Sequence, residues 1–457
     1  MHTEIKIDYG VTDWEILQHK DGFAEFEVGG SYSVSDVWTS DESAQAEIML
    51  RVYEESTDEP VIPWIAAKKG ITEWSCKLRI PCGGLYRLVS VIRFDRTLWV
   101  ERGVFGSAVH HFGVGDVYVI AGQSNAAGTG RGIFTEMPEL EVHTLRNCEK
   151  WDLATNPMYD GRGFHGPCIT FAKRLKSKLN YPIGLVPCAF GGSPLKTWIK
   201  NEDGCCYNEM MTTLKNHHIS IKGVIWYQGE SDTRTVKEAE SYLKRFRGFV
   251  FNLRKDLKDE ELPIITFQLN RLLDDLENKE ERDIAYDTIR EAQRQAARNI
   301  ENVYIVPTID AGKMTDGIHN SKASNIMLGE RAAQLILNKI YNIGMDFSAP
   351  DIASAKFISE FDVELDFDNV ADCLMTFHVG AHRLPIMIED DIGKIEIESY
   401  SLDKNKINLH IGRTAVGEAR IRCHYGTNPK ELIQDIGNQL PVLCFSNVKI
   451  TNNFNRQ

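Results

Sequence analysis

No apolar run in the 457-residue sequence approaches the roughly 20 residues that a membrane-spanning helix needs. The first residues, Met-His-Thr-Glu-Ile-Lys-Ile-Asp, do not place an apolar core behind a basic segment, so no secretory signal is visible. A leader that had been removed would leave the same sequence. On this pattern we expect a cytoplasmic protein without a membrane partner.

Basic residues are scarce relative to acidic ones. The formal net charge is -13, and no Lys-rich or Arg-rich run reaches the density typical of a nucleic-acid-binding surface. We therefore expect no nucleic-acid partner. An anionic small molecule is still compatible with this charge, but it would need a local basic site.

Motifs for metals and nucleotides are also missing. The ten cysteines show no CxxC pairs, and the adjacent Cys205 and Cys206 suit neither a zinc site nor a disulfide framework, so we expect reduced thiols. The side chains of the neighbours His110 and His111, and of His217 and His218, should diverge, which argues against metal binding. The spacing in Gly128-Thr-Gly-Arg-Gly132 matches neither the dinucleotide fingerprint nor the P-loop.

The composition is otherwise that of a globular protein, with 42% hydrophobic and 26% charged residues. A chain of this length exceeds what one hydrophobic core usually serves, so two or three domains are expected. Three regions differ in pattern. We predict a β-rich domain over residues 1–113, a central α/β domain over 114–344 and a second β-rich domain over 345–457.

The two outer regions consist of short alternating runs between turn residues, which predicts sandwich-like β domains. The N-terminal runs are Ile5 to Tyr9, Ala24 to Val28, Ala46 to Tyr53, Thr72 to Ile80 and Tyr86 to Phe94. The C-terminal runs are Val363 to Phe367, Leu374 to Val379, Lys394 to Ser399, Lys406 to Ile411 and Ala419 to Tyr425. We predict that most N-terminal tryptophans are core residues, with a sugar-binding platform as the alternative: Trp14, Trp38, Trp64, Trp74 and Trp99.

The central region alternates strands and helices, which predicts a doubly wound parallel sheet with helices on both faces. The expected strands are Val117 to Ile120, Ile183 to Ala189, Gly223 to Tyr227, Ile264 to Leu269 and Val303 to Val306. The expected helices are Ile169 to Leu179, Asn208 to Lys215, Lys237 to Lys255, Ile284 to Arg298 and Ser324 to Tyr341. Residues that follow the carboxyl ends of such strands share one edge of the sheet.

Four segments at this edge carry reactive or flexible residues. The first strand runs into Gly122-Gln-Ser-Asn125, where Ser124 and the next backbone N–H groups face the ligand edge. Phe190-Gly-Gly-Ser-Pro194 and Gln228-Gly-Glu-Ser-Asp232 follow two further strands, and Asp316-Gly-Ile-His319 follows the last strand. Together they offer a nucleophile, a base, an orienting carboxylate and oxyanion donors. Ordinary turns and helix capping are the alternatives.

These segments resemble the four blocks of the SGNH hydrolase superfamily, in the branch of sialate O-acetylesterases and related carbohydrate acetylesterases. The string Trp226-Tyr-Gln-Gly-Glu-Ser-Asp232 is the most specific piece, and the resemblance covers roughly the central half of the chain. It implies a flavodoxin-like fold for the central sheet. It also implies Ser124 as nucleophile, His319 as general base and then acid, and Asp316 as the orienting carboxylate.

By the same resemblance, the oxyanion hole uses the backbone N–H groups of Ser124 and of Gly191 or Gly192, together with the Gln228 side chain. Gln228 stands where the superfamily usually has an asparagine, as is typical of this branch. Glu230 is expected to be a buried, hydrogen-bonded framework residue. The resemblance implies no metal and no organic cofactor.

The implied reaction removes an O-acetyl group from a carbohydrate through an acetyl-enzyme. We expect O-acetylated sialic acid as the small-molecule substrate. Acetylated xylan or mannan oligosaccharides are the alternative within the same mechanism, and an inactive carbohydrate-binding protein is the alternative of a different class. The oligomeric state stays open. Candidate substrate-binding residues, among them cations for a carboxylate and an indole for a sugar ring, are Gln123, Asn125, Arg131, Lys196, Trp198, Glu230 and Arg271.

Overall fold

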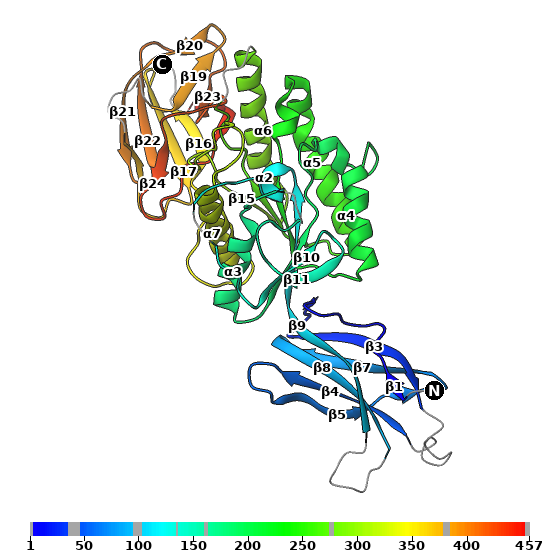
Figure 1. Cartoon of the computed structure of the whole chain (residues 1–457). Coiled ribbons are helices and arrows are strands. Elements are labelled where there is room, and N and C mark those ends of the chain that lie inside the picture. Colours follow the sequence, from blue (N-terminus) through cyan, green and yellow to red (C-terminus); the bar gives the residue numbers. More distant parts are fainter. Residues whose placement is uncertain are drawn as a thin grey trace.

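The computed structural model describes residues 3–34, 46–94, 103–133, 136–159, 163–273, 278–377 and 384–452. It is a mixed α/β protein with several sheets, in which two β-rich regions lie at the ends of a central region of strands and helices (Figure 1). The predicted α/β class is confirmed. Among the described residues, no helix is both long and apolar enough to cross a membrane.

The N-terminal region consists mainly of antiparallel strands whose apolar side chains meet in one core. Its strands are β1 (Glu4–Ile5), β2 (Ile16–Gln18), β3 (Phe23–Ser33), β4 (Glu47–Glu54), β5 (Pro60–Ala66), β6 (Lys68–Lys69), β7 (Glu73–Pro81), β8 (Gly83–Arg93) and β9 (Gly103–Gly122). Strands β1, β3, β7 and β6 form one sheet, while β5, β4 and β8 join the sheet of β9. The assignment as a sandwich-like domain stays a prediction.

The N-terminal tryptophans have different environments. Trp74 is buried in the core, as predicted. Trp14 and Trp64 are half-buried, so they keep part of their rings at the surface. Trp38 and Trp99 lie outside the described residues.

The central sheet has the strand order β11-β10-β12-β9-β13-β14-β15, and all of its pairs are parallel except β10 with β11. Strands β12 (Ile183–Pro187), β13 (Gly223–Tyr227) and the second half of β9 are buried on both faces, as expected for the middle of a parallel sheet. The remaining strands are β10 (Val142–Arg146), β11 (Lys150–Leu153), β14 (Ile264–Phe267) and β15 (Val303–Val306). Strands β10 and β11 were not predicted, because both are short and interrupted by polar residues.

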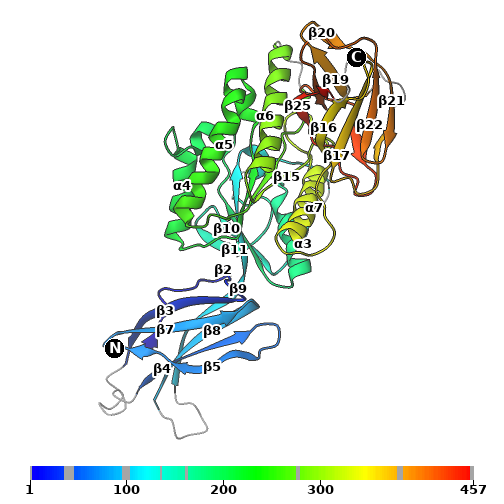
Figure 2. The ribbon, with the colours of Figure 1, turned by 180° about the vertical axis from the view of Figure 1, so that it is seen from behind.

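Helices cover both faces of this sheet (Figures 1 and 2). On one face lie α4 (Cys205–Asn216), α5 (Val236–Leu257) and α6 (Lys279–Asn299); on the other lie α3 (Cys168–Leu179) and α7 (Lys322–Lys339). Each expected helix is present. Helix α6 begins at Lys279 rather than at Ile284, because its first turn is polar and gives no apolar period.

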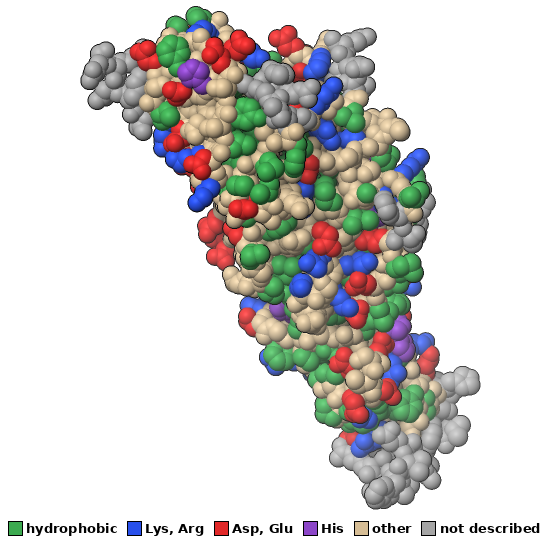
Figure 3. Space-filling view, turned by 90° about the vertical axis from the view of Figure 1, so that its left-hand side faces the viewer, with side chains coloured by type: hydrophobic (Ala, Val, Ile, Leu, Met, Phe, Trp, Pro, Cys, Tyr) green, Lys and Arg blue, Asp and Glu red, His purple; other side chains and the backbone are tan. Residues whose placement is uncertain are grey.

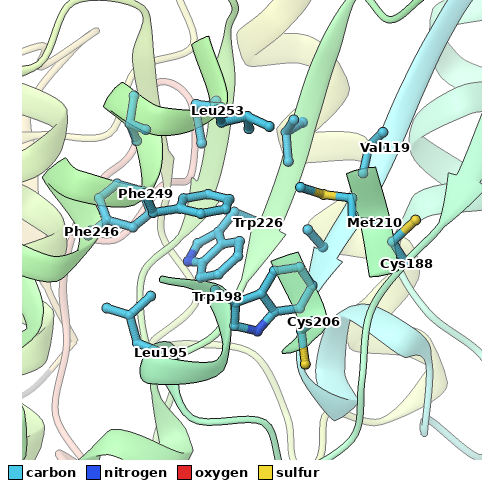
Figure 4. Packing of buried hydrophobic residues seen from close by; sticks show 14 of the residues in the cluster. Val119, Cys188, Leu195, Trp198, Cys206, Met210, Trp226, Phe246, Phe249 and Leu253 are labelled. Atoms are coloured by element: carbon cyan, nitrogen blue, oxygen red, sulfur yellow. The ribbon is translucent and has the colours of Figure 1, made fainter. Parts of the chain in front are cut away.

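The core beneath α4 and α5 is aromatic. The ring centroids of Trp198 and Trp226 are 5.2 Å apart, and those of Trp226 and Phe249 are 4.6 Å apart (Figure 4). Trp198 is fully buried, and its Nε1 donates a hydrogen bond to Ser193 Oγ. The expected stacking of Trp198 on a sugar ring is therefore wrong, because both faces of the indole are inside the core.

Strand β9 joins the N-terminal and central regions as one 20-residue strand. Its first half pairs with β8, and its second half lies between β12 and β13. Strand β2 runs beside its middle at residues 113–115. The predicted domain limit between residues 113 and 114 thus lies inside a continuous strand.

The C-terminal region contains three small sheets around its own core. One sheet holds β16 (Asp351–Phe357), β17 (Asp362–Asp368), β21 (Ile397–Asp403), β22 (Lys406–Ile411) and β26 (Thr451–Asn452). The second holds β18 (Leu374–Thr376) and β24 (Ile433–Asp435), and the third holds β19 (Ile386–Asp390), β20 (Gly393–Ile395), β23 (Arg420–Cys423) and β25 (Phe445–Lys449). The run predicted from Lys394 to Ser399 is divided between β20 and β21, and residues 378 and 379 of another predicted run lie outside the described part.

Charged side chains are distributed rather than grouped on the face shown in Figure 3, where acidic and basic residues alternate among apolar ones. Such mixing is typical of a solvated surface.

Candidate active site

Ser124 follows the carboxyl end of β9 and begins the short helix α2 (Ser124–Ala127), at the end of the central region away from the N-terminal strands (Figure 1). The turn before it needs a glycine, because Gly122 has a φ of 121° and a Cβ there would lie 2.2 Å from the Tyr227 carbonyl oxygen. The Gln123 N–H donates to the same carbonyl at 2.9 Å. The neighbouring strand β13 thus fixes the turn that presents Ser124.

His319 lies between Ser124 and Asp316. Its Nε2 is 2.9 Å from Ser124 Oγ, and its Nδ1 is 2.9 Å from Asp316 Oδ2. A neutral imidazole in this chain donates from Nδ1 to the carboxylate and accepts the serine proton at Nε2. The structure therefore brings together the three residues that the sequence predicted, across a separation of 195 positions between Ser124 and His319.

Asp316 is held as a carboxylate. Partial burial raises its pKa, but hydrogen bonds from the His319 backbone and ring and from the Ile318 backbone outweigh burial, and the pKa lies below its usual value. The Asp316 and His319 side chains are 40% and 24% exposed. The three residues thus lie at an edge that a substrate can reach.

Gly191 and Gly192 follow β12 beside this edge. Both are exposed, Gly192 has a φ of 71°, and a Cβ on either residue would meet no atom within 4 Å. Their loop is tied to the Ser124 turn, since the Phe190 N–H donates to the Gly122 carbonyl oxygen at 3.0 Å. The backbone of both glycines therefore borders open space next to Ser124.

Gln228 does not take the expected position of an oxyanion donor. It is fully buried, and its Nε2 donates to Asp232 Oδ2 at 2.5 Å and to the Ser193 carbonyl oxygen at 3.2 Å. The carboxylate fixes this orientation of the amide, because the amide oxygen in its place would face another oxygen. Both N–H groups are thus committed below the site, and we correct the role of Gln228 to holding two loops together.

Ser231 is a residue that the sequence pattern did not single out. Its N–H donates to Gln123 Oε1 at 3.2 Å, which places it next to the residue that precedes Ser124. It is half-buried, and within the described part of the chain its hydroxyl takes part in no hydrogen bond. The only available signal was its place in the Gln228-Gly-Glu-Ser-Asp232 loop.

Three candidates for substrate contacts are buried instead. Gln123, Asn125 and Glu230 are 2%, 1% and 5% exposed. Asn125 Nδ2 donates to Glu230 Oε1 at 2.6 Å, and Asn125 Oδ1 accepts the Asn320 N–H at 3.1 Å. Glu230 is thus the hydrogen-bonded framework residue that we expected, and direct substrate binding by these three residues is wrong because they support the loops from below.

The basic candidates differ in accessibility. Arg131 is exposed, and its guanidinium lies 4.1 Å from the ring centroid of the 45% exposed Phe164. Lys196 is exposed on the short helix η1 (Leu195–Trp198) that follows the glycine loop. Arg271 is half-buried, and burial lowers its pKa.

Arg131 is also linked to the loop of His319. Its backbone N–H contacts Met314 Sδ at 3.1 Å, and the Met314 N–H donates to the His319 carbonyl oxygen at 2.8 Å. The backbone of Arg131 is therefore tied to the loop that carries His319.

Among the described residues, no three His, Cys, Asp or Glu side chains are arranged so that they could hold a metal ion. The neighbours His110 and His111 both lie near Glu55, with His111 Nδ1 at 2.6 Å from Glu55 Oε2.

The chain is similar to several proteins named as esterases. Residues 114–338 match the family model described as carbohydrate esterase, sialic acid-specific acetylesterase. The chain is 29% identical over 249 residues to an Arabidopsis thaliana protein named probable carbohydrate esterase, which covers 49% of this chain and 90% of that protein. It is 26% identical over 182 residues to Homo sapiens sialate O-acetylesterase, which covers 29% of this chain and 34% of that protein.

Among solved structures, a carbohydrate acetylesterase from Xanthomonas citri is similar over nearly the whole chain. The TM-score is 0.66 at 21% identity, with 95% of this chain and 97% of that chain covered. At this identity the likeness concerns the fold alone, and it includes the β-rich regions on both sides of the central sheet.

Proposed function

We propose that Ser124, His319 and Asp316 remove O-acetyl groups from sialic acid, because residues 114–338 match the family model described as carbohydrate esterase, sialic acid-specific acetylesterase. This match and the relatives named as esterases support carboxylic ester hydrolase activity. The assignment of residues rests on two contacts: His319 Nδ1 is 2.9 Å from Asp316 Oδ2, and His319 Nε2 is 2.9 Å from Ser124 Oγ.

The first half of the reaction forms an acetyl-enzyme. His319 Nε2 takes the proton of Ser124 Oγ as that oxygen attacks the acetyl carbonyl carbon, while Asp316 holds the Nδ1–H. The tetrahedral intermediate collapses when the bond to the sugar oxygen breaks, and His319 returns its proton to that oxygen. In the second half, His319 takes a proton from water, which attacks the acetyl-enzyme and releases acetate.

The negative oxygen of each tetrahedral intermediate needs donors already in place. We assign two of these donors to the backbone N–H groups of Ser124 and of Gly191 or Gly192, because both glycines are exposed and a Cβ on either would meet no atom within 4 Å. With Gln228 committed to Asp232, we assign the side-chain donor to the hydroxyl of Ser231. Loss of one such donor lowers kcat by about 10²-fold to 10³-fold in other hydrolases.

Arg131 supports sialic acid among acetylated sugars, because a sialic acid carries a carboxylate. Its guanidinium is exposed and rests on Phe164 on the His319 side of the site. Acetylated xylan or mannan oligosaccharides would use the same triad without this cation. Arg131→Met should therefore raise KM for an acetylated sialic acid by about 10-fold to 100-fold, the range of a charged hydrogen bond, and leave p-nitrophenyl acetate unaffected.

The decisive experiment measures acetate release from O-acetylated sialic acid and from acetylated xylan oligosaccharides. Ser124→Ala should lose at least about 10³-fold in kcat, and adding His319→Ala should cost little more, because the two residues act as a unit. Ser177→Ala, on the exposed face of α3, is the matched serine control. Activity retained in Ser124→Ala contradicts the triad, whereas serine-dependent release mainly from xylan sugars moves the substrate and keeps the mechanism.

A further inference from the structure

The loop that carries His319 is closed at its base by Lys313. This residue forms an isolated β-bridge with Asn320. Between them, the Met314 N–H donates to the His319 carbonyl oxygen at 2.8 Å, and the Gly317 N–H donates to the Met314 carbonyl oxygen at 3.0 Å. The loop is therefore a small hairpin with Lys313 at its entry.

The ammonium group of Lys313 reaches across this hairpin. Its Nζ donates to the Ile318 carbonyl oxygen at 2.7 Å and to Asn320 Oδ1 at 3.1 Å. These acceptors belong to the residues immediately before and after His319. A single side chain thus restrains the backbone on both sides of the base.

Asn320 extends the restraint to the serine. Asn320 is fully buried, its N–H donates to Asn125 Oδ1 at 3.1 Å, and its Nδ2 donates to the Tyr227 hydroxyl at 3.0 Å. Asn125 is the chain neighbour of Ser124. Contacts that hold Asn320 in place therefore also set the separation of His319 from Ser124.

We propose that Lys313 is a positioning residue for the esterase reaction, which keeps His319 Nε2 within hydrogen-bond reach of Ser124 Oγ. The inference rests on the proposed function of these two residues. Lys313 contacts the backbone and an amide beside His319 and does not touch the reacting atoms.

The location of Lys313 is unfavourable for the fold. Removal from water lowers its pKa to about 7; the Glu230 and Asp316 carboxylates favour the charged form, whereas Arg271 and Arg290 oppose it. Among Glu230, Asp316, Arg271, Arg290 and His319, only the two carboxylates attract the ammonium group of Lys313. Below a pH of about 10, the unfolded chain binds this proton more tightly than the folded protein does. In that range the charged form of Lys313 therefore lowers the stability of the folded protein.

This cost separates positioning from plain structural support. Lys313 is half-buried, and an apolar chain of similar length removes the charge that desolvation disfavours, so Lys313→Met should melt at the same temperature as the parent or higher at pH 7. The advantage should shrink between pH 7 and pH 10, because the parent loses its unfavourable proton in that range. If Lys313 served stability alone, the substitution would lower Tm.

The test measures kcat, KM and Tm of the full chain with O-acetylated sialic acid and with p-nitrophenyl acetate. For Lys313→Met we expect kcat to fall by about 10-fold to 100-fold on both esters with KM nearly unchanged, as for a displaced catalytic group. Lys313→Arg keeps a donor cation and should recover part of kcat. Lys178→Met, exposed on α3, is the matched control.

The inference is overturned if Lys313→Met keeps the kcat of the parent. It is also overturned if kcat falls only together with a fall in Tm. Failure of the proposed function gives a different result, since Ser124→Ala would then remain active. Full activity of Lys313→Met beside an inactive Ser124→Ala contradicts only the positioning role.

Discussion

The two β-rich regions meet the central region at different places and by different means. The N-terminal region continues through the backbone of β9, which enters the central sheet at Asp116 and reaches Ser124 only after its far end (Figure 1). The C-terminal region packs beside α6 and α7 and contacts loops at the carboxyl ends of the strands. The comparison suggests that one region supports the fold alone, while the other also supports the site.

The C-terminal contacts reach the catalytic loop in two steps. The Leu272 N–H donates to the Thr427 carbonyl oxygen at 2.8 Å, and the adjacent Leu273 N–H donates to the Gly317 carbonyl oxygen at 3.0 Å. Gly317 follows Asp316 directly. A displacement of the loop around Thr427 would thus be passed to the carboxylate that orients His319.

The N-terminal junction depends on a buried carboxylate far from that loop. Asp116 accepts hydrogen bonds from Gln18 Nε2, from the Tyr181 hydroxyl and from the Tyr341 hydroxyl, each at 2.7 Å. Burial raises its pKa, but bonds from His19, Tyr341, Gln18 and Tyr181 outweigh burial and hold the pKa at about 2. This carboxylate joins strand β9 to Gln18 of the N-terminal region and to Tyr181 and Tyr341 of the central region.

The largest effect is expected where the C-terminal region is anchored to α6. Arg290 is fully buried and donates to the carbonyl oxygens of Leu269, Asn270 and Gly426. Arg290→Met removes a buried cation and leaves these acceptors unpaired, so the free energy of unfolding should fall by about 3–5 kcal/mol. Release of the loop at Gly426 would also displace Leu272 and Leu273, which contact Thr427 and Gly317, so kcat should fall as well.

Denaturant unfolding and ester turnover on the same preparations check this prediction. Lys244→Met, an exposed substitution on α5, should change neither quantity. If Arg290→Met kept full kcat per folded molecule despite its loss of stability, the C-terminal region would support the fold alone, and the contrast between the two regions would disappear.

An intermediate effect on stability, with none on turnover, is expected at the N-terminal junction. The pKa of Asp116 is lowered from 3.8 to about 2, which corresponds to about 2 kcal/mol of stability. This contribution is present above a pH of about 4 and is lost as the pH falls toward 2, since the unfolded chain takes up the proton first.

Asp116→Asn should therefore unfold more readily than the parent at pH 7, with a difference that shrinks between pH 4 and pH 2. Its kcat per folded molecule should equal that of the parent. A lowered kcat would show that the N-terminal junction also influences the site, contrary to the comparison. Unfolding curves across this pH range and active-site titration of the folded fraction supply the two measurements.

The sequence was a good guide to those site residues whose role is decided by their place in the sheet. It was a poorer guide to residues whose role is decided by the orientation of the side chain. Ser124 and His319 each follow a strand, so the order of elements was enough to bring them to one edge. Gln228 also follows a strand, yet its amide turns toward Asp232 in its own loop and toward the Ser193 carbonyl oxygen in the glycine loop. No local pattern records that competition.

Burial and strand continuity were similarly out of reach. Trp198 stands in a polar-looking segment, but the short helix η1 directs its indole toward Trp226 in the aromatic core. The length of β9 could not be read from its residues, because the strand passes from its pairing with β8 to its pairing with β13 without a turn between them. Both features are set by tertiary packing rather than by propensity.

The smallest effect is expected from a pair of substitutions that removes one hydroxyl from each β-rich region. This pair compares the two regions most directly. Thr427 Oγ1 donates to Asp283 Oδ1 at 2.8 Å, and Ser90 Oγ donates to the Ser107 carbonyl oxygen at 3.0 Å. Both residues are buried, so Thr427→Val and Ser90→Ala should each lower the free energy of unfolding by about 1 kcal/mol.

Their effects on turnover should differ. Thr427→Val loosens the loop whose carbonyl oxygen holds Leu272, so kcat should fall a few-fold, whereas Ser90→Ala should leave kcat unchanged. Paired measurements of unfolding and kcat would decide between a general stability effect and a specific one. Equal kcat values at equal loss of stability would mean that the C-terminal contacts transmit nothing to Asp316, and the two β-rich regions would then be equivalent supports.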